Sequence, residues 1–167
     1  MKKLLLILLC LPMIGFGQTA EEYYTKGYNI KDNWSADLQN HKDAITYFTS
    51  AIRINPNYFE AYKYRGEAYA SLENYEAAIA DFTEAIRINP NSSGSYRSRG
   101  NAYEALENYE AAIADFTEAM RIYPNYHSFY KERGIAKYKA GLPYCSDFRR
   151  ACELESWACE LDSLYCR

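Results

Sequence analysis

Apolar and small residues recur along the middle of this chain with the period of an α-helix. Two successive sets have the spacing i, i+4, i+7: Tyr62, Gly66 and Tyr69, then Ala78, Phe82 and Ala85. Residues with this spacing share one face of a helix. The pattern therefore predicts two amphipathic helices in succession.

The residues around these two stretches predict where the second helix begins and ends. Asn74 lies between them, where its side-chain oxygen can accept a hydrogen bond from the first turn of the second helix. Pro90 follows the second stretch and cannot continue a helix. Gly66 and Ala78 are small, which lets the two helices approach closely. We expect a helical hairpin over residues 57–90.

The whole pattern repeats with a period of 34 residues. The letters LENYEAAIADFTEA occur at 72–85 and again at 106–119, and residues 67–90 agree with residues 101–124 at 19 of 24 positions. Pro56, Pro90 and Pro124 have the same spacing. One hairpin cannot bury its own apolar face, but stacked hairpins bury each other's. The sequence therefore predicts an all-α stack of similar hairpins.

The repeated positions resemble the tetratricopeptide repeat (TPR) family. Two sets match in the same register: Tyr62, Gly66, Tyr69, Ala78, Phe82, Ala85 and Pro90, then Tyr96, Gly100, Tyr103, Ala112, Phe116, Ala119 and Pro124. The resemblance implies a right-handed TPR solenoid of about four helical hairpins plus a C-terminal capping helix. It also implies a protein-binding scaffold without enzymatic activity, whose first helices line a concave groove.

Two further units match with defects. The first, at about 20–56, carries five extra residues between Ile30 and Asn40, among them Trp34. We expect Trp34 to pack between the ends of longer helices, with an exposed contact residue as the alternative. The fourth, at about 125–156, fits if two residues are deleted, and it ends at Ser156 instead of proline. With units at 57–90 and 91–124 and a cap at 157–167, no stretch remains for a catalytic domain.

The first 17 residues have the order of a bacterial secretory signal peptide. Lys2 and Lys3 precede an apolar run over 4–16, and Gly15 and Gly17 supply the small residues of a cleavage site. The run is shorter than the about 20 residues that a membrane span needs. Cys10 lies too early for a lipoprotein signal. We expect cleavage after Gly17 and export to the periplasm or the extracellular space.

Charge and motifs narrow the function of the expected mature chain, 18–167. Loss of two lysines leaves 17 basic and 22 acidic side chains, a net charge of −5. A mildly acidic chain without a basic run is a poor nucleic-acid binder, because phosphate contacts dominate that affinity. No catalytic, metal-binding or phosphate-binding motif is present, so we expect no enzyme, no cofactor and no metal. No second segment of the mature chain is long and apolar enough to cross a membrane.

Four cysteines with equal spacing lie in the last 23 residues: Cys145, Cys152, Cys159 and Cys166. In an oxidising compartment an even number predicts disulfides, with zinc binding as the alternative. Residues seven apart in one helix are roughly 10 Å apart, too far for the about 4.4–6.8 Å that a disulfide requires. In an antiparallel pair of helices, the residue numbers of two facing residues always add up to the same value. The nested pairs Cys152–Cys159 and Cys145–Cys166 share one such value, so we predict these two disulfides.

The TPR resemblance places the fifth and ninth positions of each first helix on the concave face. The partner-binding residues expected there are Lys63, Glu67, Arg97, Asn101 and Lys131. The three cations predict a basic ladder that selects an acidic or carboxylate-rich protein or peptide. A solvated helix face, with Lys63 paired to Glu67, is the alternative. Co-chaperone TPR domains clamp a C-terminal carboxylate with a basic residue, an asparagine four residues later and an asparagine of the next repeat. Arg97 and Asn101 match the first pair, but Glu132 stands where the next asparagine is needed, so we do not expect this mode of binding.

Two other sets of residues that recur at equivalent positions of the repeats have structural explanations. Arg65, Arg99 and Arg133 recur in step with Asp81, Asp115 and Asp147. The first unit lacks both partners, which indicates an ion pair within each repeat, worth about 0–1 kcal/mol if exposed. The many tyrosines at repeat positions are expected to pack between helices, with their hydroxyls near water, and a role in stacking on a ligand is the alternative. Two other functional classes stay open: a structural subunit of a cell-envelope assembly, and a small thiol-redox protein that uses the C-terminal cysteines.

Overall fold

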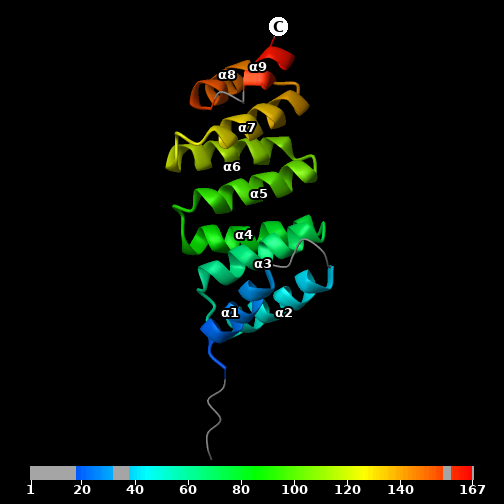
Figure 1. Ribbon diagram of the computed structural model, residues 1–167, viewed down its shortest axis with the longest axis vertical. Coiled ribbons are helices and arrows are strands. Elements are labelled where there is room, and N and C mark those ends of the chain that lie inside the picture. Colours follow the sequence, from blue (N-terminus) through cyan, green and yellow to red (C-terminus); the bar gives the residue numbers. More distant parts are fainter. Residues whose placement is uncertain (1–17, 32–37, 156–158, 167) are drawn as a thin grey trace, which may run out of the picture.

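The computed structural model describes residues 18–31, 38–155 and 159–166 of the chain. These residues form helices and no strands: α1 (Ala20–Lys31), α2 (Leu38–Ile54), α3 (Phe59–Ser71), α4 (Tyr75–Ile88), α5 (Ser93–Ala105), α6 (Tyr109–Ile122), α7 (His127–Lys139), α8 (Cys145–Leu154) and α9 (Cys159–Tyr165). Each helix packs on the next one along the chain, and α5 also contacts α3 and α7. Figure 1 shows the resulting single file of helical hairpins. The predicted all-α solenoid of four hairpins and a cap is confirmed.

Asparagines begin the second helices of the two central hairpins, as the sequence predicted. The side chains of Asn74 and Asn108 accept hydrogen bonds from the backbone amides of Ala77 and Ala111, at 3.3 and 3.2 Å. The residue before each asparagine has a positive φ of 59°, which lets the chain reverse at the end of the first helix. In the first hairpin α2 begins at Leu38, so the corresponding Asn40 lies inside the helix. Trp34 lies outside the described residues.

A glycine and a phenylalanine meet inside each hairpin. The four pairs are Gly27 with Phe48, Gly66 with Phe82, Gly100 with Phe116, and Gly134 with Phe148. A Cβ atom on Gly100 would lie 2.8 Å from Cε1 of Phe116, closer than van der Waals contact allows. The four phenylalanines are almost fully buried, at 0–1% exposure. Glycine is therefore required where the first helix crosses the ring of the second.

The predicted arginine–aspartate pairs exist and reach further than one repeat. Arg99 donates from Nε and Nη2 to the two oxygens of Asp115, at 2.8 and 2.7 Å. Its third nitrogen, Nη1, donates to Oγ1 of Thr83 in the preceding hairpin, at 3.0 Å. The same arrangement recurs one repeat earlier and one repeat later: Arg65 with Asp81 and Thr49, and Arg133 with Asp147 and Thr117.

The burial of these pairs differs from the exposed pair that the sequence analysis considered. The side chains of Arg99 and Asp115 are only 17% and 7% exposed. The recurrence of arginine and aspartate in step does not predict the contact between each arginine and a threonine of the preceding hairpin. Each arginine is therefore a buried link between neighbouring hairpins.

The C-terminal cap brings the predicted cysteine pairs together. Cys145 lies beside Cys166 and Cys152 beside Cys159, with Cα–Cα distances of 5.6 and 4.4 Å. Tyr144 also donates a hydrogen bond from its hydroxyl to the backbone carbonyl of Tyr165, at 3.0 Å. The geometry permits the nested pairing. Oxidation of both pairs in the exported protein stays a prediction.

Candidate functional site

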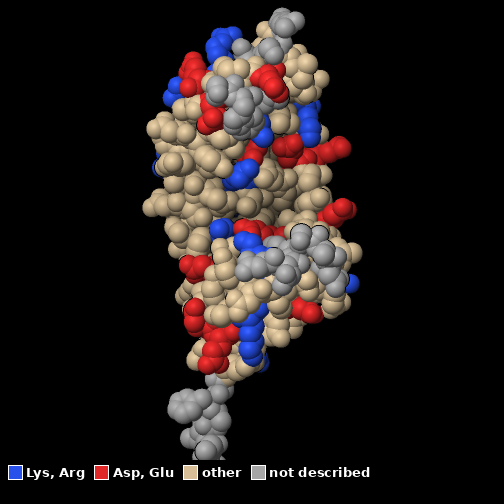
Figure 2. Space-filling model, in the orientation of Figure 1, with Lys and Arg blue, Asp and Glu red and all other residues tan. Residues whose placement is uncertain are grey.

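The first helices of the hairpins lie next to one another and carry all of the predicted groove residues. Lys63 and Glu67 belong to α3, Arg97 and Asn101 to α5, and Lys131 to α7. The view in Figure 2 shows a face that is hollowed near mid-height, where most of the atoms are uncharged. The structure thus places the five residues on three adjacent helices of one stack.

A hollow of about 330 Å³, here called the groove hollow, joins α1, α3 and α5. Its lining comprises Lys31, Glu67, Ala70, Ser71, Phe82, Ser98 and Asn101. Two of the predicted residues, Glu67 and Asn101, are brought together here. Lys31 was missed by the sequence analysis, although it follows Gly27 by four residues just as Ala70 follows Gly66. That equivalence was the available signal.

Ion pairs within the molecule engage Lys63 and Arg97 of the predicted ladder. Lys63 Nζ lies 3.9 Å from a carboxylate oxygen of Glu67, and Lys31 Nζ lies 3.1 Å from the other. Arg97 Nε donates to both carboxylate oxygens of Glu132, each at 2.9 Å. The hydrogen bond with Glu132 raises the pKa of the Arg97 guanidinium. The alternative pairing of Lys63 with Glu67 is therefore present, and the selection of acidic partners stays a prediction.

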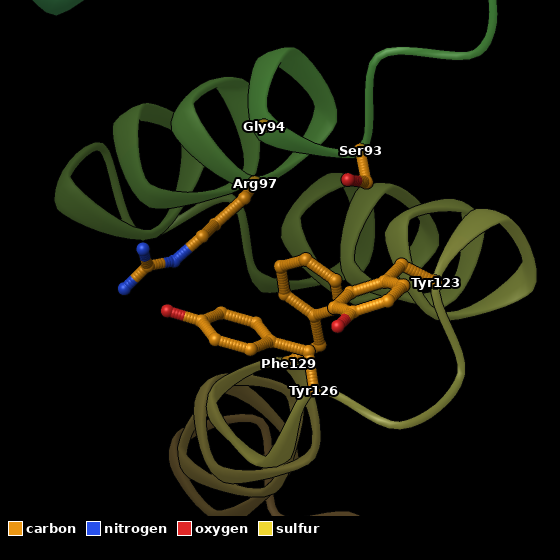
Figure 3. A pocket seen from close by; sticks show the side chains of 6 residues that line it. All are labelled: Ser93, Gly94, Arg97, Tyr123, Tyr126 and Phe129. Atoms are coloured by element: carbon orange, nitrogen blue, oxygen red, sulfur yellow. The ribbon is translucent and has the colours of Figure 1, made fainter.

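A second hollow of about 280 Å³, here called the aromatic pocket, lies between the third and fourth hairpins. Its lining comprises Ser93, Gly94, Arg97, Tyr123, Tyr126 and Phe129. Figure 3 shows Arg97 and the Tyr126 hydroxyl on one side, the Tyr123 ring on the other, and the first turn of α5 across from the rings. The rings of Tyr126 and Phe129 meet edge to face, with centroids 4.8 Å apart. Tyr123 is 55% exposed, so it forms an open wall.

This pocket was not predicted from the sequence. The tyrosines were expected, as a group, to pack between helices, and among the lining residues only Arg97 was a predicted site residue. A comparison of each repeat with the next could have found it, because Tyr123 and Phe129 replace the Asn89 and Ser95 of the preceding unit.

Other kinds of site are not found within the described residues. No group of three or more histidine, cysteine, aspartate or glutamate side chains in that part of the chain could hold a metal ion. Over the same residues, no helix has both the length and the apolar character of a membrane span.

A file of helical hairpins whose first helices share one face defines a helical-repeat solenoid. The family model of the tetratricopeptide repeat matches residues 59–92 and 95–126, and a second model of the same repeat matches residues 36–58. Together the matches cover more than half of the chain, which therefore belongs to the tetratricopeptide repeat family. Proteins of this family are generally scaffolds for interactions with other proteins and not enzymes.

Solved structures with the same fold have low sequence identity to this chain. The crystal structure of MamA is 23% identical, with a TM-score of 0.77 over 84% of this chain and 81% of MamA. The first TPR of Spaghetti (RPAP3), bound to the HSP90 peptide SRMEEVD, is 22% identical, with a TM-score of 0.69 over 74% of this chain and 94% of that one. The TPR domain of Arabidopsis OM64 is 25% identical, with a TM-score of 0.66 and coverage of 71% and 94%. No curated protein matches the chain significantly.

Proposed function

We propose that this chain is an exported scaffold that binds a peptide segment of a partner protein along its first helices, at the groove hollow. The observation that carries the proposal is the hollow itself, which α1, α3 and α5 line with polar and small side chains beside Phe82 of α4. Among the described residues, the Asn101 side chain has no hydrogen-bonding partner and is exposed. A side-chain amide both donates and accepts, so Asn101 can bond to a peptide backbone.

The RPAP3 domain supports peptide binding as the mode, because it holds a short peptide on a similar fold. The carboxylate-clamp version of that mode is disfavoured here. Glu132 lies where a clamp asparagine would be needed, and it is bonded to Arg97. A peptide carboxylate would have to displace Glu132 from the arginine. We therefore propose an internal, extended segment of the partner as the ligand.

Export is supported by the order of charged, apolar and small residues over 1–17, which lie outside the described residues. We expect the mature protein to begin at Gln18. Intact-mass measurement of the protein from the envelope or culture-medium fraction tests this. Retention of Met1 on most molecules would contradict it.

The groove proposal is tested by selecting binders from a random peptide library displayed on phage and measuring their affinities. Ala70 lines the hollow, and Ala70→Trp should fill it and weaken the selected peptides about tenfold or more. Ala114 is exposed on the second helix α6, so Ala114→Trp is the matched control and should leave the affinity unchanged. Both variants should keep the circular dichroism of the parent. Absence of any selected peptide, or equal losses in the two variants, would refute groove binding.

Acidic selectivity is a separate arm of the same experiment. If the ladder acts, the selected peptides should be rich in aspartate and glutamate, and their affinity should fall as salt rises from low to physiological concentration, where the Debye length is about 8 Å. Reversal of charge at Lys63, Arg97 and Lys131 together should release them. Selection of neutral peptides whose affinity does not change with salt would support groove binding but contradict a preference for acidic partners.

A further inference from the structure

The aromatic pocket arises where two neighbouring repeats both depart from the common pattern. On one wall, the third unit has Ser93 and Gly94 where the second unit has Phe59 and Glu60. Gly94 has open space around the position of a Cβ atom. On the other wall, the exposed Tyr123 at the end of the third unit and the buried Phe129 of the fourth stand in place of an asparagine and a serine. Small residues face large aromatic ones, so the stacking of identical hairpins does not account for this hollow.

The chemistry of the pocket favours an uncharged aromatic ligand. The rings of Tyr123, Tyr126 and Phe129 provide faces and edges, and aromatic pairs are most favourable with centroids about 4.5–7 Å apart. Arg97 lies 5.9 Å from the centroid of Tyr126, and its charge is balanced by Glu132. An anionic ligand would therefore compete with an existing ion pair, whereas a neutral ring would not.

The size and position of the pocket indicate one side chain of a longer ligand. The volume of about 280 Å³ lies just below the about 300–1,000 Å³ typical of small-molecule sites. Arg97 lines this pocket and Asn101, one helical turn further along α5, lines the groove hollow. Residues four apart share a helix face, so one extended ligand along α5 can reach both hollows.

We propose that the aromatic pocket binds a tyrosine, phenylalanine or tryptophan side chain of the partner segment, and that this anchor sets sequence specificity. The proposal rests on groove binding for the partner as a whole. The recognition of a ring by the pocket can be measured without that partner.

The direct test uses N-acetyl-tyrosinamide as the probe, with N-acetyl-leucinamide as the aliphatic comparison, in titrations of the ¹⁵N-labelled mature protein followed by NMR. We expect the tyrosine probe to shift the backbone amides of Gly94 and Tyr126, with a dissociation constant on the order of millimolar for a ligand of this size. The variant Gly94→Leu projects a side chain into the open space and should weaken the probe about tenfold. Glu60→Leu places the same side chain at the equivalent exposed position of the second unit and should have no effect.

The outcomes separate the pocket from the groove. Aromatic residues at one fixed position of the displayed peptides, with affinity lost in both Gly94→Leu and Ala70→Trp, support the pocket. Peptides that lose affinity in Ala70→Trp but not in Gly94→Leu overturn the pocket and leave groove binding standing. Equal responses to the tyrosine and leucine probes also overturn it. So does stronger binding of methyl β-glucopyranoside, which would identify a sugar site instead.

Discussion

The glycine of each hairpin is fixed by contact with a buried ring. Gly100 crosses Phe116, which has no exposed surface and is packed from all sides. Protein interiors are close-packed, so such a ring has no space into which it can retreat. Gly94 lies six positions earlier on the same helix and faces open space. Substitutions at the two glycines of α5 therefore measure the effects of packing and of helix propensity separately.

We expect Gly100→Ala to lower the free energy of unfolding by about 1–3 kcal/mol, because the added methyl group overpacks against Phe116. Gly94→Ala should raise it by about 0.5 kcal/mol, because alanine favours a helix more than glycine does and meets no neighbour. Urea unfolding followed by circular dichroism measures both values. An equal response of the two variants would show that the ring contact is not limiting.

At the scale of elements, the arginine column links one hairpin to the next. Arg99 holds Asp115 of its own hairpin through two hydrogen bonds and Thr83 of the preceding one through a third. Thr83 in turn donates to the carbonyl of Ile79, at 2.7 Å, which fixes its hydroxyl for the arginine. The first hairpin has Lys26 and Tyr47 at the arginine and aspartate positions, so the column begins at the second unit.

We expect Arg99→Met to lower the free energy of unfolding by about 3 kcal/mol, because it leaves the buried Asp115 carboxylate without its partner. Arg121 forms a comparable pair with Glu118, but the two side chains are 61% and 43% exposed. Arg121→Met should therefore cost no more than about 0.5 kcal/mol. The double variant Arg99→Met, Asp115→Leu should recover much of the loss, since no charge stays buried. Thermal and urea unfolding measure all three, and no recovery in the double variant would contradict the explanation.

At the scale of the whole molecule, we expect the terminal units of the stack to be the least stable. Each hairpin of a solenoid contacts only its neighbours, so a terminal unit has support on one side. The cap α9 has seven residues, and within the described residues it packs on α8. A short helix of this kind is marginal without a covalent or packing constraint. Oxidation of the two cysteine pairs would supply that constraint where fraying is expected to begin.

We expect non-reducing peptide mapping of the exported protein to find Cys145–Cys166 and Cys152–Cys159. Reduction should then increase hydrogen exchange in α8 and α9 and leave α3 to α6 unchanged, because each bond contributes about 2–4 kcal/mol to the local unit only. The variant Cys145→Ser, Cys166→Ser should show the same local effect without reductant. A Cys145–Cys159 linkage, or free thiols in the native protein, would contradict the nested arrangement.

Local sequence determined the elements of this protein. The asparagine caps and proline stops of the central hairpins act within a few residues, and the 34-residue period repeats the pattern along the chain, so together they predicted the hairpins and their number. The Gly66 and Phe82 positions were visible for the same reason: they recur in every unit. The cysteine register could also be computed, because seven-residue spacing on two antiparallel helices permits one common alignment.

Only the tertiary structure decided what lies between the hairpins. Thr83 meets Arg99, Lys31 meets Glu67, and Glu132 meets Arg97 across repeat boundaries, where a period in the sequence does not specify side-chain direction. Of these contacts, the one between Glu132 and Arg97 pairs a cation of the expected ladder within the molecule. The stacking of the hairpins also forms the aromatic pocket. Its two walls lie about 30 residues apart in the chain and become neighbours only in the folded stack.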